Sequence, residues 1–407
     1  MEAEPESTIP AEVEFCLELG RCLQAFGTPA HRFEATLTRI CRRFGLQGQF
    51  FALPTGFLAS ISGKNFNRSA VERAPNGDMD LEKLTKLQWI TEAVLEGRMS
   101  AVEASEALRL LVSARPRYGK TARILAYGAA SASAVWFFGG GWREASLALL
   151  LGLFTGLLEA RARQKKTLGY LFHLVAAGCV AFLSLTAARW IPALSAPVPT
   201  LAGLIVLVPG LGFLIAMNEL ATNNLVAGTA RLAGVGMIFL QLAFGVALGQ
   251  RFAQLWAGSV AAPELAAMAW WALIPALVIW ALAFLVIFQA MPDDAGWILV
   301  ACAFAFGAAR LGTHFLGGAF GAGLGAWVLG SGSNLVARLR GRPPWVTLLP
   351  GIMLLVPGSV GLRSLDYVLN KQMLTGLDTA FQMVFLAVAI LMGLLLANLM
   401  VRSKELL

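Results

Sequence analysis

The sequence predicts a helical polytopic membrane protein of about ten spans, arranged as two inverted five-span repeats with Pro-Gly-broken helices, plus a small N-terminal α+β domain. Three observations predict this fold class. First, 57% of the 407 residues are hydrophobic and only 14% are charged, whereas about a quarter of the residues of a typical soluble domain are charged. Second, apolar runs alternate with short polar breaks from about residue 122 onward. Third, the residues LVPG occur twice inside such runs, at 207–210 and at 355–358.

Charge divides the chain into two parts. Residues 1–118 hold 14 Lys/Arg and 15 Asp/Glu, whereas residues 119–407 hold 18 Lys/Arg and 9 Asp/Glu. The excess positive charge therefore belongs to the apolar part, for which lipid headgroups rather than nucleic acid are the expected counterpart. The expected parts are a disordered acidic tail at 1–13, a cytoplasmic α+β domain at 14–118, and two membrane repeats at 119–259 and 260–407. The tail lacks the basic and apolar regions of a secretory signal.

The N-terminal domain is expected to contain two helices, a pair of strands and two further helices. Thr28-Pro29 opens the second helix, QFFALPTGFLASISG has the content of strands, and Asp80 and Ser100 are the expected caps of the last two helices. His31 with Glu34 suggests acid–base chemistry, but no nucleophile motif, metal-ligand spacing or phosphate loop accompanies them. We therefore expect a docking or regulatory role, without catalytic residues, metal or cofactor. A membrane-anchored enzyme or sensor acting through this domain is the alternative.

The predicted spans lie near 122–140, 144–160, 169–187, 199–217, 230–250, 268–290, 296–312, 316–336, 345–365 and 377–401. The clearest, from Met268 to Met291, has no charge in 24 residues, and about 20 apolar residues suffice to cross a bilayer. With the N-terminal domain in the cytoplasm, twelve Lys/Arg lie in inner loops and six in outer loops. This excess favours that orientation. The expected location is a bacterial inner membrane.

A shift of 148 residues aligns part of the chain with itself. Residues 201–249 align with residues 349–397 without a gap, and several glycines and prolines fall in register. The matched positions are Gly203 with Gly351, Pro209-Gly210 with Pro357-Gly358, Gly228 with Gly376, and Gly245 with Gly393. Because each half would hold an odd number of spans, the second copy is expected to enter the membrane upside down. Inverted repeats with interrupted helices are typical of secondary transporters, which bind the solute between the halves.

The Pro-Gly pairs are expected to interrupt helices at membrane depth, with an extra break at Pro350-Gly351 in the second half. Backbone groups freed by a break are tolerated only against protein or a water-filled cavity. A half-helix N-terminus favours an anion, and a C-terminus favours a cation. The breaks therefore suit a small solute that bears a carboxylate and, in a zwitterion, an ammonium group. Prolines that merely kink helices for packing are the alternative.

At these residues the chain resembles the threonine/serine exporter family. The stretch LVPGLGFLIAMNELATNNLVAGTARL is similar to the family's core motif, with matches at Pro209, Gly210, Glu219, Gly228 and Arg231. The stretch from LLPGIMLLVPGS onward is similar to its C-terminal module, with matches at Pro350, Gly351, Pro357, Gly358, Ser359 and Gly376. The N-terminal domain resembles the family's opening helix pair at Gly27, Pro29, Ala30, His31, Arg32 and Glu34, and its Pro-Thr-Gly segment at Pro54 to Gly56.

The resemblance covers roughly residues 14 to 400 and implies export of small carboxylated metabolites, threonine or serine, driven by the proton gradient. One departure leaves the solute open, because Asn223-Asn224 stand where the family usually has a second acidic position. Some relatives resemble dicarboxylate transporters, so succinate and similar dicarboxylates are the alternative solutes. The expected partners are the solute and membrane lipid, not nucleic acid, and the sequence leaves open whether the chain forms a homo-oligomer.

The candidate residues for solute binding or gating are Pro209, Gly210, Asn218, Glu219, Arg231, Pro350, Gly351, Pro357, Gly358, Ser359 and Asp366. Ionisable groups at membrane depth are costly and are functional candidates for that reason. Arg231 could neutralise Glu219 or grip a solute carboxylate, and Arg363 could pair with Asp366.

The candidates for proton coupling are Glu159, His173 and His314. Histidine titrates near neutral pH and could carry the proton. Glu159 could instead pair with Arg161 or Arg163 at the inner membrane interface.

Overall fold

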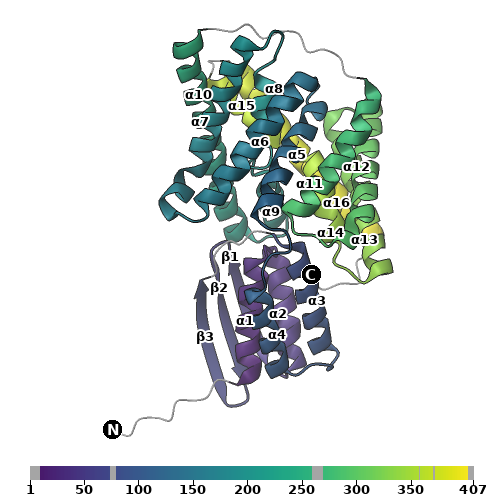
Figure 1. Ribbon diagram of the computed structural model, residues 1–407. Coiled ribbons are helices and arrows are strands. Elements are labelled where there is room, and N and C mark those ends of the chain that lie inside the picture. The colour runs from purple at the N-terminus through teal and green to yellow at the C-terminus, as the bar shows by residue number, and fades with distance from the viewer. Residues whose placement is uncertain (1–9, 74–78, 259–268, 357, 370–371, 402–407) are drawn as a thin grey trace.

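The computed structural model describes residues 10–73, 79–258, 269–356, 358–369 and 372–401. An N-terminal unit of helices and a sheet lies at one end of a larger bundle of helices (Figure 1). One buried core connects the two, because Phe15 and Phe57 in the N-terminal unit belong to the same cluster as Phe284 and Leu349 in the bundle. The described parts of the chain are therefore packed together rather than joined only by a linker.

The N-terminal unit packs four helices on one face of an antiparallel sheet (Figure 1). Its elements are α1 (Ala11–Ala25), α2 (Ala30–Arg43), β1 (Gln47–Leu53), β2 (Gly56–Gly63), β3 (Phe66–Arg73), α3 (Leu81–Leu95) and α4 (Ala101–Ser113). The rings of Phe33 on α2 and Phe57 on β2 lie 5.0 Å apart between the helices and the sheet. Aromatic side chains bury large apolar areas, so such pairs hold the two layers together.

The sequence predicted a pair of strands, whereas the structure has three. The third strand, β3, has the polar sequence FNRSAVER and most of it is exposed, so it lacks the apolar alternation that marks a half-buried strand. Backbone pairing with β2 holds it at the edge of the sheet. Both predicted helix caps are confirmed: Asp80 accepts from the N–H of Lys83, and Ser100 forms a capping box with Glu103.

The bundle begins at residue 120, and its described elements are helices. Its α-helices are α5 (Lys120–Phe137), α6 (Trp142–Ala162), α7 (Lys166–Trp190), α8 (Pro197–Gly203), α9 (Gly210–Ala221), α10 (Leu225–Ala257), α11 (Leu273–Ile287), α12 (Ala295–Leu316), α13 (Gly318–Arg340), α14 (Trp345–Leu355), α15 (Gly358–Leu369) and α16 (Met373–Met400).

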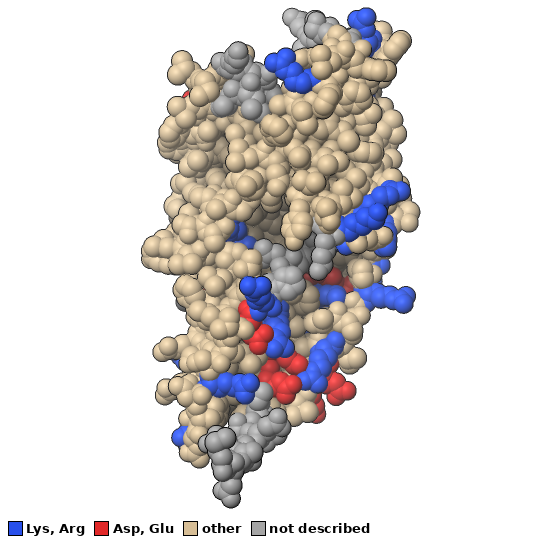
Figure 2. Space-filling view, turned by 90° about the vertical axis from the view of Figure 1, so that its left-hand side faces the viewer, with Lys and Arg blue, Asp and Glu red and all other residues tan. Residues whose placement is uncertain are grey.

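Seven helical segments of the described chain are long and apolar enough to cross a membrane, so the chain is a polytopic membrane protein. They are 142–162, 167–190, 225–256, 270–287, 292–316, 345–365 and 373–400. Helices α5 and α13 are not among the seven and are rich in Gly, Ala and Ser. On the face shown in Figure 2, most of the bundle surface is uncharged, and charged side chains gather on the N-terminal unit and where it meets the bundle.

Two segments of the bundle are each built from two short helices. The chain leaves helical geometry between α8 and α9, at 204–209, and again between α14 and α15, just after Leu355. In Figure 1, α9 and α14 lie next to the N-terminal unit, whereas α8 and α15 lie toward the opposite end of the bundle. The two broken segments therefore cross the bundle in opposite directions.

The predicted extra break at Pro350-Gly351 is wrong. Helix α14 continues through Pro350 from Trp345 to Leu355. Because proline lacks only its own backbone N–H, the helix loses one hydrogen bond, to the carbonyl of Val346 in its first turn. The carbonyl oxygen of Pro350 accepts a hydrogen bond from the indole of Trp280 at 3.4 Å, so packing against α11 supports this part of the helix.

Hydrogen bonds fix the N-terminal unit to the bundle at the start of α3. The backbone N–H groups of Leu81 and Glu82 donate to the carbonyls of Phe288 and Gln289, at 2.9 and 3.2 Å. These donors belong to the first turn of α3 and the acceptors directly follow α11, so each helix end satisfies groups that the other would leave unpaired. The side chain of Gln289 also accepts from the N–H of Tyr118 at 2.8 Å. Specific hydrogen bonds therefore join the N-terminal unit to the bundle at this junction.

Candidate functional site

A cavity of about 310 Å³ lies where the bundle meets the N-terminal unit. Helices α9, α13, α14 and α16 of the bundle line it together with α2 and its cap residue Pro29. Leucine is the most frequent lining residue, and the polar or aromatic lining residues are His31, Arg32, Asn218, Thr222, Asn334, Trp345 and Asn398. A mostly apolar hollow with a few placed polar groups is the usual form of a small-molecule site.

Two asparagines from different helices meet in this cavity. The Nδ2 group of Asn334 on α13 donates to Oδ1 of Asn398 on α16 at 2.9 Å and to the carbonyl of Val401 at 2.8 Å. Asn334 is buried, and buried amides in membrane spans are costly unless they are hydrogen-bonded. Since both N–H groups of Asn334 are engaged, its carbonyl oxygen is the group that it can offer to a solute.

The N-terminal unit supplies the cationic part of the cavity wall. The guanidinium of Arg32 lies 4.9 Å above the ring of Trp345, the first residue of α14. The neighbouring His31 is neutral at pH 7, because burial, together with the charge of Arg32, lowers the pKa of its imidazole to about 4, against an opposing effect of Glu219. Among the described lining residues, Arg32 is therefore the one with a full charge.

Glu219, beside the cavity, is fully buried and joins the two parts of the molecule. Its carboxylate accepts two hydrogen bonds from Arg231, both at 2.9 Å, and a third from the backbone N–H of Ala30 at 3.3 Å. Ala30 is the first residue of α2, which has no side-chain cap and no acidic residue in its first turn. A carboxylate at a helix N-terminus satisfies unpaired N–H groups and the helix dipole, so Glu219 acts as the cap of α2.

The structure places Arg231 as in one of the two roles that the sequence suggested for it. Its guanidinium is engaged in the two-pronged pair with Glu219, which is the neutralising role. Asn218 lines the cavity as a candidate solute contact should. Of the residues that follow the first break, Asn218 therefore faces the cavity, whereas Glu219, paired with Arg231, contacts the N-terminal unit.

The two Pro-Gly breaks meet each other inside the bundle. A Cβ atom added at Gly210 would lie 3.6 Å from the Cα of Gly358 and would overlap the side chain of Val356. Conversely, a Cβ atom added at Gly358 would lie 3.5 Å from the Cα of Gly210 and would overlap the side chain of Val208. The glycines allow this close approach. Gly210, the first residue of α9, thus packs against the second break, whereas the next residue, Leu211, lines the cavity.

Other predicted site residues lie away from the cavity lining. Gly351 faces Leu329 on α13, and Ser359 is half-buried in the first turn of α15. Pro357 lies outside the described residues, and so does the side chain of Asp366, so its predicted pairing with Arg363 is untested. Arg363 lies 5.5 Å above the ring of Phe138.

The three coupling candidates lie on three different helices, α6, α7 and α12. Glu159 is buried and pairs with Arg163 and with Arg123, which agrees with the paired alternative for this residue. His173 is half-buried on α7 beside the ring of Phe172. His314 is exposed near the end of α12. The described residues contain no group of three or more His, Cys, Asp or Glu side chains that could hold a metal ion.

Sequence reasoning missed most of the cavity wall. Asn334 and Asn398 are amides in helices of mostly apolar sequence, and polar side chains in such segments are a recognisable signal. His31 and Arg32 were matched to a family motif, but nothing in the local sequence shows that they lie beside the bundle. Trp345 carries no signal that separates it from other aromatic residues at span ends.

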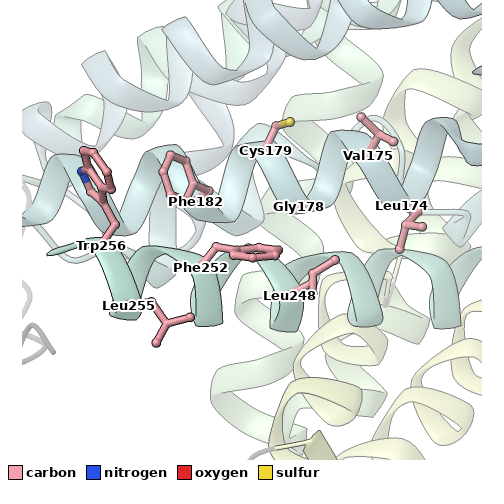
Figure 3. Close-up of a pocket in the computed structure, with 10 residues that line it drawn as sticks. Leu174, Val175, Gly178, Cys179, Phe182, Leu248, Phe252, Leu255 and Trp256 are labelled. Atoms are coloured by element: carbon pink, nitrogen blue, oxygen red, sulfur yellow. The ribbon is translucent and has the colours of Figure 1, made fainter. Parts of the chain in front are cut away.

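A larger groove of about 600 Å³ lies between α7 and α10, but it is a poor candidate for this solute (Figure 3). Its lining includes Phe182, Leu248, Phe252 and Trp256, and it contains no charged or amide side chain. Such a surface has nothing to bind a carboxylate. In a membrane it is the kind of surface that lipid chains cover.

Two family models match the sequence of the chain. Residues 14–253 match the threonine/serine exporter family, and residues 274–400 match the model described as "Threonine/Serine exporter, ThrE". No solved structure matches the chain.

Two curated relatives of similar sequence are fungal proteins, and both are longer than this chain. An uncharacterized protein of Schizosaccharomyces pombe is 28% identical over 366 residues, which are 85% of this chain and 47% of that protein. Pheromone-regulated membrane protein 10 of Candida albicans is 28% identical over 387 residues, 90% of this chain and 34% of that protein. The chain thus spans less than half the length of the relatives it matches. With two family matches that together cover most of its length, the chain belongs to the threonine/serine exporter family, a family of membrane transporters rather than enzymes.

Proposed function

We propose that the chain is a secondary active exporter of small amino acids, threonine and serine, and that the cavity beside Asn334 and Arg32 holds the solute. The composition of the cavity carries this proposal. A single guanidinium suits one carboxylate, and the amide groups suit the hydroxyl and ammonium groups of a small amino acid. A dicarboxylate such as succinate would bring a second negative charge for which the described lining offers no second cation.

The proposed architecture is two inverted repeats of five spans each. The reciprocal packing of Val208 on Gly358 and of Val356 on Gly210 supports it, because the members of each pair are exchanged by the shift of 148 residues. Such self-complementary contacts are what a two-fold relation between two copies produces. The opposite directions of the two broken segments also agree with it (Figure 1).

We place the N-terminal unit in the cytoplasm. The predicted excess of Lys and Arg on that side supports this orientation. The cavity then lies at the cytoplasmic end of the bundle, where an exporter must collect its solute. The bacterial inner membrane stays a prediction, because the matched relatives are fungal.

Proton coupling also belongs to this proposal. Of the three coupling candidates, Glu159 is already held by two arginines. His173 and His314 have no ion pair among the described residues, and we propose that one of them carries the coupled proton. Replacing each histidine with glutamine, and measuring export with and without an inward proton gradient, tests this assignment. Equal stimulation by the gradient in both variants would contradict it.

Counterflow in proteoliposomes tests the proposed solute. Liposomes containing the purified chain are preloaded with threonine, serine or succinate, and uptake of the same labelled compound is followed. We expect exchange of threonine and serine but not of succinate. Exchange of succinate alone would move the chain to dicarboxylate export, and no exchange of any of the three would contradict the proposed function.

A further inference from the structure

We propose that the N-terminal unit is itself part of the solute site: Arg32 binds the solute carboxylate, and Glu219 positions Arg32 by capping helix α2 from the bundle. The proposal rests on the proposed function and adds to it the residues that recognise the solute. It also gives the N-terminal unit a direct role in transport.

Arg32 is the described lining residue suited to a carboxylate. Its guanidinium is planar and presents hydrogen-bond donors along its edges. The Cζ atom of this guanidinium lies 4.9 Å above the ring of Trp345, a cation–π contact that favours this position of the group. The other nearby arginine, Arg231, does not line the cavity and holds Glu219 by two hydrogen bonds.

Glu219 controls where Arg32 lies. Its carboxylate holds the N–H of Ala30, and Arg32 is two residues further along the same first turn of α2. Because α2 has no cap of its own, the start of this helix depends on a residue of the bundle. Arg231 in turn fixes the Glu219 carboxylate from the other side. Arg231, Glu219 and Ala30 thus form a chain of contacts that places the guanidinium in the cavity.

The remaining polar groups suit the rest of an amino acid. The carbonyl oxygen of Asn334 can accept from an ammonium or hydroxyl group, and so can a nitrogen of the neutral imidazole of His31. The Nδ1 atom of His31 is buried and has no hydrogen-bond partner among the described residues. A solute with one carboxylate and one ammonium group therefore meets a complementary group at each end, one from the N-terminal unit and one from the bundle.

Release of the solute must then break contacts with both parts of the molecule. Since Arg32 belongs to the N-terminal unit, a solute bound to it also holds α2 against the bundle. Any motion that withdraws α2 would remove the carboxylate ligand and open the cavity at the same time.

The experiment uses the full chain in proteoliposomes and compares threonine with threoninol, in which a hydroxymethyl group replaces the carboxylate. For the wild type we expect threonine to inhibit counterflow at least about tenfold better than threoninol, the effect of one charge-assisted contact. Arg32→Ala should raise the KM for threonine about tenfold, leave the maximal rate within about twofold, and abolish this preference. Arg39→Ala, an exposed arginine on the same helix, is the matched control and should behave as the wild type.

Two further variants keep the proposal testable if Arg32→Ala does not fold. Arg32→Lys retains the charge but not the planar fork and should raise the KM about threefold. Glu219→Gln should also raise the KM, and in the Arg32→Lys background it should add much less than it does alone, because both changes act through the same guanidinium.

The outcomes separate this proposal from the proposed function. If the wild type exchanges threonine, but Arg32→Ala or Arg32→Lys keeps both the KM and the preference over threoninol, Arg32 does not bind the carboxylate. Additive effects of Glu219→Gln and Arg32→Lys would overturn the positioning role of Glu219. Absence of threonine and serine exchange by the wild type would instead contradict the proposed function.

Discussion

Glu219, on helix α9, contacts both the bundle and the N-terminal unit. Its side chain is fully buried and pairs with Arg231 and with the backbone of Ala30. A buried carboxylate is stable only when its charge is neutralised and its oxygens are hydrogen-bonded. Arg231 neutralises this charge within the bundle, whereas the hydrogen bond from Ala30 forms only while the two parts of the molecule are docked.

We expect Glu219→Ala to loosen the start of α2 and to destabilise the chain by about 2–4 kcal/mol, because it leaves Arg231 partly buried without its partner. Hydrogen exchange of the α2 amides and thermal unfolding in detergent measure the two effects. Glu72→Ala is the matched control, since Glu72 makes a similar two-pronged pair with the half-exposed Arg21. An exposed pair contributes at most about 1 kcal/mol. Equal effects of the two variants would contradict the capping role.

Exchange of the two partners gives a sharper test of the cap. In the double variant Glu219→Arg with Arg231→Glu, an ion pair can form again, but a cation then faces the N-terminus of α2. Because that end of the helix is partially positive, we expect fast exchange of the α2 amides to persist. Slow exchange restored to the wild-type level would show that the ion pair alone matters.

Acid should weaken the docking of α2 through His31. The pKa of its imidazole is about 4 in the docked state, below the ordinary value of 6.5. A lowered pKa means that docking is most stable above pH 6.5 and loses stability as the pH falls from 6.5 toward 4. Arg32 and Glu219 are the charged groups that act on His31, with opposite effects.

Hydrogen exchange of the α2 amides at pH 7.5 and 5.5, corrected for intrinsic rates, measures this dependence. We expect the wild type to lose protection at pH 5.5 and His31→Gln to lose much less. An identical loss in both proteins would assign the pH dependence to another group.

At the scale of elements, the two Pro-Gly breaks pack against each other inside the bundle. Residues 148 positions apart pack reciprocally, and the lack of side chains at Gly210 and Gly358 lets the two backbones approach. Interiors that are packed this closely tolerate added atoms poorly. The repeated LVPG is therefore explained by a close contact between the two copies.

We expect Gly210→Ala and Gly358→Ala each to destabilise the chain by about 1–3 kcal/mol through overlap with a valine of the other break. The overlap predicts specific partners for rescue: Val356→Ala should rescue Gly210→Ala, and Val208→Ala should rescue Gly358→Ala. Thermal unfolding in detergent measures both. Gly236→Ala in α10, where an added Cβ meets no atom within 4 Å, should be close to neutral. Rescue that does not follow these pairs would contradict the reciprocal contact.

Elements with a clear local signal could be predicted from the sequence. Long apolar helices such as α11 and α16, and the caps at Asp80 and Ser100, follow from hydropathy and from local hydrogen bonding. Two predictions failed for opposite reasons. Strand β3 has a polar sequence and depends on its neighbour β2, and Pro350 looks like a helix breaker but lies where α14 can tolerate it.

The candidate site could be predicted only in part. Asn218, Glu219 and Arg231 follow one broken helix closely in sequence, so a local motif identifies them together. Asn334, Trp345 and Asn398 come from three other helices, and Arg32 lies 186 positions before Asn218. Their proximity is a property of the tertiary fold and leaves no local signal in a single sequence.

At the scale of the whole molecule, the proposed orientation predicts which cysteines can be labelled from each side. Arg340 and Arg189 are both exposed at helix ends, but Arg340 ends α13 near the N-terminal unit and Arg189 lies in the last turn of α7 at the opposite end of the bundle. In intact cells we expect an impermeant maleimide to label Arg189→Cys and to spare Arg340→Cys. Labelling of both only after permeabilisation, or the reverse pattern, would contradict the orientation.

The most direct test of the account is whether threonine occupies the cavity. Thr222→Cys places a thiol in the cavity lining, and the native Cys179 lies in the apolar groove between α7 and α10. The rate at which a small maleimide labels each thiol is measured in the purified chain with and without threonine, and the wild type gives the background of the native thiols. We predict that threonine slows the labelling of Thr222→Cys several-fold and leaves that of Cys179 unchanged. No protection at Thr222→Cys by threonine or serine, or equal protection at both thiols, would contradict the claim that this cavity is the solute site.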